Sequence, residues 1–313
     1  MIDFLNNFLF QYNNHIKREI ASKAICLCVI IHISVLIPDI YNLLSSHGLI
    51  DAGIQNSFIF STDPRLSWIV GPLMKLGVSE SVSILAIVCV YMLSLLCVIF
   101  GYARLICSFF ALFLHVMILD STYLYGYGAD YIETFLLFIN LFLNIDAIVN
   151  VGKGNIINSF AFRLLQIQLF IIYFFSGFGK AMGTDWWNGN AIWFMMNTYG
   201  NLYLKDISVI LSSYPFFFKI SGWLIMIMEL LYPILIMFKK TRKTAFFFMV
   251  AMHLAIAFIM KLYFFGAIMI VFNIIAFGEI FKINKKVIEF AIWFDEKILS
   301  KPKFEVNVKT QNQ

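Results

Sequence analysis

The sequence predicts an all-α protein, a polytopic transmembrane helical bundle of about eight spans, from its composition and its long apolar runs. Of 313 residues, 61% are hydrophobic and only 13% are charged, whereas soluble domains are about 45–50% apolar and about 25% charged. Too few polar side chains remain to cover a surface in water, so lipid must be the solvent for most of the exterior. The composition excludes a soluble enzyme. The net charge of +5 is spread in short clusters, a pattern typical of loop anchoring and not of nucleic-acid binding.

The first segment, residues 1–19, contains no small-residue cleavage site after an apolar core, so we expect no cleavable signal peptide. Its apolar residues Phe4, Leu5, Phe8 and Leu9 recur at helical spacing. That spacing predicts a cytoplasmic segment whose apolar face lies on the membrane surface.

The transmembrane domain is predicted to cover residues 20–281. Several of its apolar runs are near the lower limit of about 17 residues for crossing roughly 30 Å of hydrocarbon. The second and third runs, and the seventh and eighth, are separated by so few residues that each pair predicts a helical hairpin. The runs are 20–42, 81–101, 104–120, 131–149, 160–180, 219–238, 244–260 and 262–281.

Basic residues predict the orientation, because Lys and Arg in short loops collect on the cytoplasmic side. With eight spans, the basic clusters all fall on one side, and the longer loops 43–80 and 181–218 fall on the other. We therefore expect both ends of the chain in the cytoplasm and the protein in the cell membrane. The clusters are Lys17, Arg18 and Lys23; Arg104; Lys153 and Arg163; Lys239, Lys240, Arg242 and Lys243; and Lys282, Lys285 and Lys286.

The C-terminal segment, residues 282–313, begins with apolar residues at helical spacing and ends in a polar stretch. It predicts a cytoplasmic amphipathic helix followed by a disordered tail. The five cysteines lie inside apolar runs without metal-ligand spacing, so we predict that they pack in the core and that the protein holds no metal.

Ionisable residues inside the spans are the candidates for function, because placing them in a membrane is costly. His32 and Asp39 are seven residues apart, as are the members of a seam formed by Gln166, Tyr173 and Lys180, and this interval places side chains on one face of a helix. A buried lysine can act as a base, although a nearby glutamate would hold it charged. Structural roles remain open: a lysine can reach the interface, and polar groups can join helices. The ionisable set is His32, Asp39, His115, Glu133, Lys180, Glu229 and His253.

One stretch, RLLQIQLFIIYFFSGFGKAMGTDWWNGNAIWFMMN at 163–197, resembles the signature of the HTTM family, the membrane domain related to vitamin K-dependent γ-carboxylase. Three further segments resemble other parts of that family: 45–51, 229–243 with its Glu-x-x-x-Pro helix, and 253–277 with its His-bearing hairpin. The matching positions are Arg163, Gln166, Tyr173, Ser176, Gly177, Lys180, Trp187 and Gly189.

The resemblance implies a role for Lys180, because the lysine of this motif in the carboxylase deprotonates vitamin K hydroquinone. It also implies a quinone as a candidate cofactor. Three departures argue against γ-carboxylation itself: the stretch 120–133 has no histidine, the large lumenal region is missing, and the Lys-to-Trp interval differs. The chain is more similar to short bacterial members of the sporulation-delaying protein B type, which act in maturation of a secreted peptide toxin.

Together these features predict a site with Lys180 as base or anion holder, and Glu229 and His253 as its partners. The expected pocket residues are Gln166, Tyr173, Trp186, Trp187, Gly189, Glu133 and His115. Whether the protein is an enzyme stays open. A modifying enzyme or maturation factor would act at the extracytoplasmic side on a quinone, lipid or exported peptide. The alternatives are a transporter or channel, and a non-catalytic partner of a small membrane protein or exported peptide in a toxin maturation or export complex.

Overall fold

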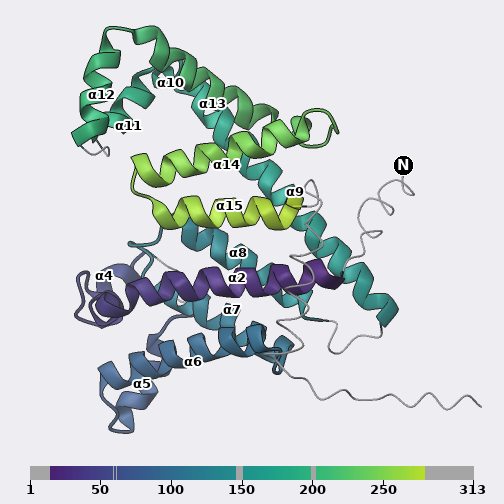
Figure 1. Ribbon diagram of the computed structural model, residues 1–313. Coiled ribbons are helices and arrows are strands. Elements are labelled where there is room, and N and C mark those ends of the chain that lie inside the picture. The colour runs from purple at the N-terminus through teal and green to yellow at the C-terminus, as the bar shows by residue number, and fades with distance from the viewer. Residues whose placement is uncertain (1–14, 59, 61, 146–150, 199–201, 279–313) are drawn as a thin grey trace, which may run out of the picture. The chain divides into compact units, whose positions relative to one another are not determined.

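The computed structural model describes residues 15–278, apart from positions 59, 61, 146–150 and 199–201 (Figure 1). All regular structure in this part of the chain is helical, as the sequence predicts. The described helices belong to one compact unit, Met1–Gly278. Most of the predicted N-terminal segment and all of the predicted C-terminal tail lie outside the described residues.

The helices of the first half are α2 (His15–Leu36), η1 (Ile37–Asp39), α3 (Ile40–Leu44), α4 (Ala52–Asn56), α5 (Ser67–Lys75), α6 (Glu80–Phe100), α7 (Arg104–Ser121) and α8 (Gly128–Leu143). The helices of the second half are α9 (Val151–Met182), α10 (Thr184–Asn188), α11 (Asn190–Thr198), α12 (Leu202–Ser212), α13 (Pro215–Leu235), α14 (Arg242–Ile259) and α15 (Tyr263–Phe277).

Each of the eight predicted runs is helical, but within the residues that the structure describes six helical segments are long and apolar enough to count as candidate membrane spans. The other two runs correspond to α8 and α15, which have 16 and 15 residues. At 1.5 Å per residue, such helices extend only about 22–24 Å. The candidate spans are Arg18–Leu44, Glu80–Phe100, Arg104–Ser121, Ile156–Met182, Pro215–Leu235 and Arg242–Ile259.

The first candidate span is not one continuous α-helix. Pro38 lies in the short 3-10 helix η1, which interrupts the chain between α2 and α3. Proline has no backbone N–H and cannot continue the hydrogen-bond ladder of the preceding helix. His32 therefore belongs to α2, whereas Asp39 lies beyond its end and is exposed. The helical face predicted to join these two residues does not form.

The helices pack as two neighbouring groups within the unit. In the first group, α2 packs against α6 and α8, and α7 packs against both α6 and α8. In the second group, α9 packs against α13 and α15, and α14 packs against α13 and α15. Helix α15 contacts both groups, because it also packs against α2 and α8; Figure 1 shows it between α14 and α2.

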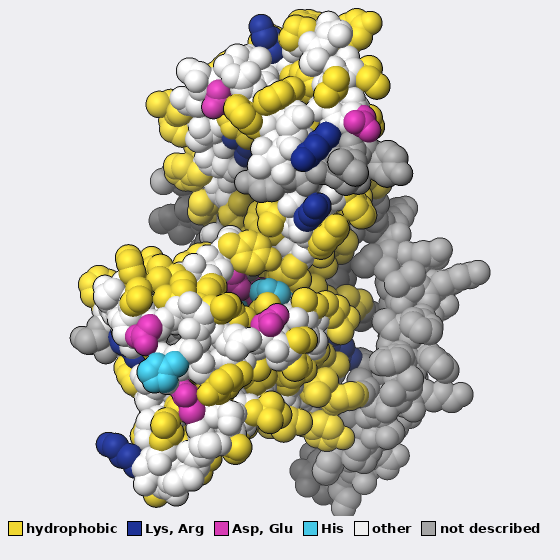
Figure 2. All heavy atoms as spheres, turned by 90° about the vertical axis from the view of Figure 1, so that its left-hand side faces the viewer, with side chains coloured by type: hydrophobic (Ala, Val, Ile, Leu, Met, Phe, Trp, Pro, Cys, Tyr) yellow, Lys and Arg dark blue, Asp and Glu magenta, His cyan; other side chains and the backbone are white. Residues whose placement is uncertain are grey.

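The surface and the core have the distribution expected in lipid. Large apolar side chains are exposed along the spans, among them Leu27, Leu93 and Phe175. Hydrophobic side chains also cover much of the face in Figure 2, with only scattered charges between them. Polar and ionisable side chains, including Asn140 and Glu229, are buried instead. Because lipid is the solvent that tolerates this arrangement, the protein is an integral multi-pass membrane protein in contact with the bilayer.

Candidate functional site

A cavity of about 640 Å³ lies among helices of the second group and the short helices α10 to α12. Its wall is almost wholly apolar, and Lys180 and Glu229 are the two ionisable residues that reach it. Such a site suits a hydrophobic ligand with one polar end. Its aromatic and sulfur-containing lining residues are Trp186, Phe217, Phe248, Phe265, Met195, Met196, Met252 and Met260.

Lys180 and Glu229 form an ion pair between α9 and α13. The ammonium nitrogen lies 2.6 Å from Oε2 of Glu229 and 2.6 Å from the hydroxyl of Ser176. The lysine side chain is 19% exposed and the glutamate side chain is 4% exposed. The lysine nitrogen also lies 5.1 Å from the centre of the Trp186 ring, close enough for a cation–π interaction. The pair is thus a polar group at the edge of the apolar cavity.

Two backbone features of α9 and α13 lie close to this pair. Gly177 lies one helical turn before Lys180, and a Cβ at position 177 would be 2.7 Å from the backbone nitrogen of Leu230. Glycine therefore permits a close approach of α9 and α13 at this level. Pro233 lies inside α13, four residues after Glu229, and has no N–H to donate to the Glu229 carbonyl.

The two tryptophans have different positions. Trp186 lines the cavity, whereas Trp187 is 49% exposed, donates a hydrogen bond to the Ala181 carbonyl and accepts one from Trp223 through its backbone oxygen. Gly189 adopts φ +89°, and a Cβ there would lie 2.7 Å from the Lys219 nitrogen. Gly189 thus shapes the turn beside the cavity without lining it.

Tyr173 and His253 form a buried polar network next to the cavity. The Tyr173 hydroxyl lies 2.9 Å from Nε2 of His253 and accepts a hydrogen bond of 2.5 Å from the Asn273 amide. The Tyr232 hydroxyl donates to Asn273 Oδ1 at 2.7 Å. Nδ1 of His253 is buried without a hydrogen-bond partner. Neither Tyr173 nor His253 is among the cavity-lining residues.

The three residues of the seven-residue seam on α9 therefore do not face one common helix. Gln166 donates to the carbonyl of Ala276 on α15 at 2.8 Å, Tyr173 reaches α14 and α15, and Lys180 reaches α13. The interval of seven residues falls about 20° short of two full turns, so the seam drifts around the helix. Gln166 lies away from the cavity.

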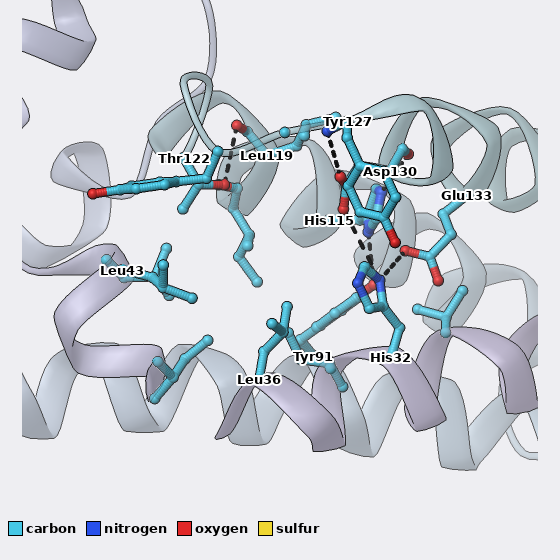
Figure 3. A pocket seen from close by; sticks show the side chains of 17 residues that line it. His32, Leu36, Leu43, Tyr91, His115, Leu119, Thr122, Tyr127, Asp130 and Glu133 are labelled. Carbon is cyan, nitrogen blue, oxygen red and sulfur yellow. Dashed lines mark hydrogen bonds and ion pairs between the residues drawn. The ribbon is translucent and has the colours of Figure 1, made fainter. Parts of the chain in front are cut away.

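His115 and Glu133 belong to a second, smaller pocket of about 150 Å³ in the first group of helices (Figure 3). The structure does not bring them to Lys180. Nδ1 of His32 lies 2.8 Å from Oε2 of Glu133 and 4.0 Å from Oδ1 of Asp130. His115 lies deeper, with Nδ1 at 2.8 Å from the Tyr91 hydroxyl.

Asp130 is the residue of this pocket that the sequence did not single out. The fourth apolar run was predicted to begin at 131, but α8 begins at Gly128. Oδ2 of Asp130 accepts a hydrogen bond of 2.8 Å from the backbone N–H of Tyr127, a helix-capping contact. The sequence did contain one signal for it: Asp130 and Glu133 are three residues apart, which places both side chains on one face of a helix. Burial, reinforced by Asp130, raises the pKa of Tyr127 to about 12, so its hydroxyl remains protonated.

Comparison with known proteins identifies the family. The HTTM domain matches residues 68–279, which is more than half of the chain. The matched region includes α6 to α9 and α13 to α15, and with them the Lys180–Glu229 pair. No curated protein and no solved structure matches the chain. The chain belongs to the HTTM family.

Proposed function

We propose that this protein is a membrane-embedded modifying or maturation factor that binds a hydrophobic ligand with an acidic head group, a quinol or a lipid, and accepts a proton from it. The observation that carries this proposal is the Lys180–Glu229 pair, 2.6 Å apart, at the wall of an otherwise apolar cavity of about 640 Å³. The apolar wall would bind the tail or ring of the ligand, and the pair would meet its hydroxyl.

The pair can take up one proton as a unit. An ammonium with a carboxylate holds the same number of protons as a neutral amine with a carboxylic acid. When a hydroxyl of the ligand releases its proton, the pair becomes ammonium and carboxylic acid. The ligand becomes an oxyanion beside the Lys180 ammonium, and charge stabilisation in a water-poor site is strong. In the amine and carboxylic acid form of the pair, Lys180 is the base that accepts this proton. Its ammonium then holds the anion, and Glu229 carries the additional proton of the pair.

We further propose eight spans with both termini in the cytoplasm, α8 and α15 crossing as short helices. Two contacts support the alternating direction of the first helices across the membrane. Arg104, at the start of α7, lies 2.9 Å from Glu19 near the start of α2. On the other side, beyond α3, the backbone N–H of Ser46 donates a 2.7 Å hydrogen bond to the carboxylate of Glu80, the first residue of α6. In this topology the Lys180 cavity belongs to the extracytoplasmic half.

The biological setting we propose is a bacterial cell membrane, where a short HTTM protein of the sporulation-delaying protein B type would assist maturation of an exported peptide. His253 and Tyr173 would support the site indirectly, since they lie beside the cavity and fix the packing of α9 against α14.

Ligand binding and proton uptake test the proposal directly. Full-length protein in detergent is titrated anaerobically with a short-chain naphthohydroquinone, followed by tryptophan fluorescence and by the absorbance of the quinol anion. Wild-type protein should bind saturably and generate the anion. Lys180→Met should bind at least about 10-fold more weakly and generate no anion, because the ammonium and the base are both lost. Lys75→Met, an exposed lysine on α5, is the matched control and should equal wild type.

Equal binding and equal anion formation by Lys180→Met and wild type would overturn the assignment of Lys180. Native mass spectrometry of the purified protein separates the ligand classes. A co-purified quinone or lipid, retained by wild type and lost from Lys180→Met, supports the proposal, whereas a co-purified peptide that survives the substitution supports a non-catalytic partner role.

A further inference from the structure

We propose that His32, Asp130 and Glu133 form a binding site for a divalent first-row transition-metal ion, separate from the Lys180 cavity. One nitrogen and two carboxylate oxygens, from α2 and from the first turns of α8, converge at one edge of the smaller pocket (Figure 3). This site departs from the sequence-based prediction that the protein holds no metal. It goes beyond the proposed function and does not depend on it.

The distances between the donor atoms fit a shared ion. Each residue offers one ligand atom, and these atoms all lie within 4.8 Å of one another. Nδ1 of His32 is 2.8 Å from Glu133 Oε2 and 4.0 Å from Asp130 Oδ1. Ligand atoms about 2.1 Å from a tetrahedral metal ion lie about 3.4 Å apart. The two distances from His32 bracket this value and differ from it by about 0.6 Å, and the donor atoms of Asp130 and Glu133 lie within 4.8 Å of each other.

An unpartnered buried oxygen points to a missing ligand. Glu133 is 1% exposed, and its Oε1 has no hydrogen-bond partner. A buried carboxylate oxygen without a partner costs free energy. Among the described residues, neither Asp130 nor Glu133 forms an ion pair with a lysine or arginine. Two carboxylates and one neutral imidazole carry a charge of −2, which a divalent cation would neutralise.

The groups around the three donors hold them in place, as outer-shell partners do in metal sites. The second carboxylate oxygen of Asp130 accepts from the backbone N–H of Tyr127, and its backbone oxygen lies 3.3 Å from Nε2 of His115. The His32 ring stacks on Phe264 with centroids 3.9 Å apart and an angle of 12° between the planes. The stack fixes the plane of the His32 ring, and the 2.8 Å contact with Glu133 fixes its Nδ1 edge.

The donor set indicates the class of metal. Imidazole favours zinc, iron, copper and nickel, whereas carboxylates favour harder ions such as manganese. A site with one imidazole and two carboxylates therefore suits Zn²⁺, Fe²⁺, Co²⁺ or Mn²⁺. Three protein ligands leave at least one coordination position open. The adjoining cavity of about 150 Å³ has room for several waters, and the hydroxyl of Thr122 and the ring of Tyr127 line it. The open position would therefore hold a water.

Zinc binding by the full-length protein in detergent tests the site. After treatment with a chelator and dialysis, the protein is titrated with Zn²⁺ by calorimetry, and bound metal is counted by elemental analysis. Wild type should bind one equivalent. His32→Ala and Glu133→Gln should bind at least about 100-fold more weakly, because even loss of an outer-shell partner costs about 10–100-fold. The matched controls, His47→Ala and Asp120→Asn, should bind as wild type does.

X-ray absorption of the zinc-loaded wild type keeps the test independent of whether the variants fold. A shell of nitrogen and oxygen at about 2.0–2.2 Å without sulfur is expected. Three results would each overturn the proposal: no saturable binding of Zn²⁺, Co²⁺ or Mn²⁺ by wild type, a sulfur ligand from a cysteine, or unchanged affinity in folded His32→Ala and Glu133→Gln.

Discussion

Gly177 and Gly179 provide a matched pair of substitutions on α9 that tests how the Lys180–Glu229 pair is held. An alanine Cβ at position 177 would lie 2.7 Å from the nitrogen of Leu230 and 3.1 Å from the Cβ of Glu229. At position 179, no heavy atom lies within 4 Å of the added Cβ. The added methyl group therefore contacts the backbone of α13 at position 177 but no neighbouring heavy atom at position 179.

The expected effects differ in sign. Ordinary van der Waals contact begins at 3.4 Å, so Gly177→Ala must move α13 away from α9 by about 0.7 Å. Overpacking of this kind costs about 1–3 kcal/mol. Gly179→Ala should stabilise the helix by about 0.5–1 kcal/mol, because alanine loses less backbone entropy than glycine. The two variants should differ by about 1.5–4 kcal/mol in the free energy of unfolding.

Circular dichroism during SDS titration of the detergent-solubilised protein measures this difference. Gly177→Ala should also weaken binding at the Lys180 cavity, since Glu229 moves with α13, while Gly179→Ala should leave it unchanged. If Gly177→Ala proves as stable as Gly179→Ala, close packing of α9 on α13 is not what positions the ion pair.

Three further predictions use the same unfolding measurement. Tyr173→Phe should lose about 1–3 kcal/mol, because Nε2 of buried His253 loses its partner; no loss would mean that water replaces the hydroxyl. Gly189→Ala should cost more than Gly77→Ala, since both have positive φ but only the former meets neighbouring backbone; equal costs would contradict the close approach. Arg104→Gln should cost less than about 1 kcal/mol and less still at high salt; a larger, salt-independent loss would show that packing dominates.

The helices were predictable because their signal is local. Composition and apolar runs located each long helix, and the positions of α6 and α7 differ from the prediction by at most one residue. The α6–α7 link was also visible, since Gly101 can adopt the left-handed conformation that ends α6. The bounds of an apolar run do not always give the bounds of the helix. The run at 131–149 corresponds to α8, which begins at Gly128 and ends at Leu143.

It was harder to predict which candidate residues lie together, because no regular spacing in the sequence shows which helices contact each other. The family motif singled out Lys180, and the Glu-x-x-x-Pro element singled out Glu229, which the structure places 2.6 Å apart. His115 and Glu133 were predicted to line the pocket of Lys180, although they line a different one. An ionisable residue inside a predicted span can be recognised from the sequence, but the helices that pack around it cannot.

The two pockets are nevertheless joined by consecutive aromatic residues of α15. Phe264 stacks on His32, and Phe265 lines the Lys180 cavity. Successive residues of a helix point about 100° apart, so one turn of α15 contacts both His32 of the smaller pocket and the Lys180 cavity. Gly266 fixes that turn against α14, since a Cβ there would lie 2.6 Å from the His253 carbonyl oxygen. A movement of the α15 backbone at Phe265 would therefore also displace Phe264, the ring that stacks on His32.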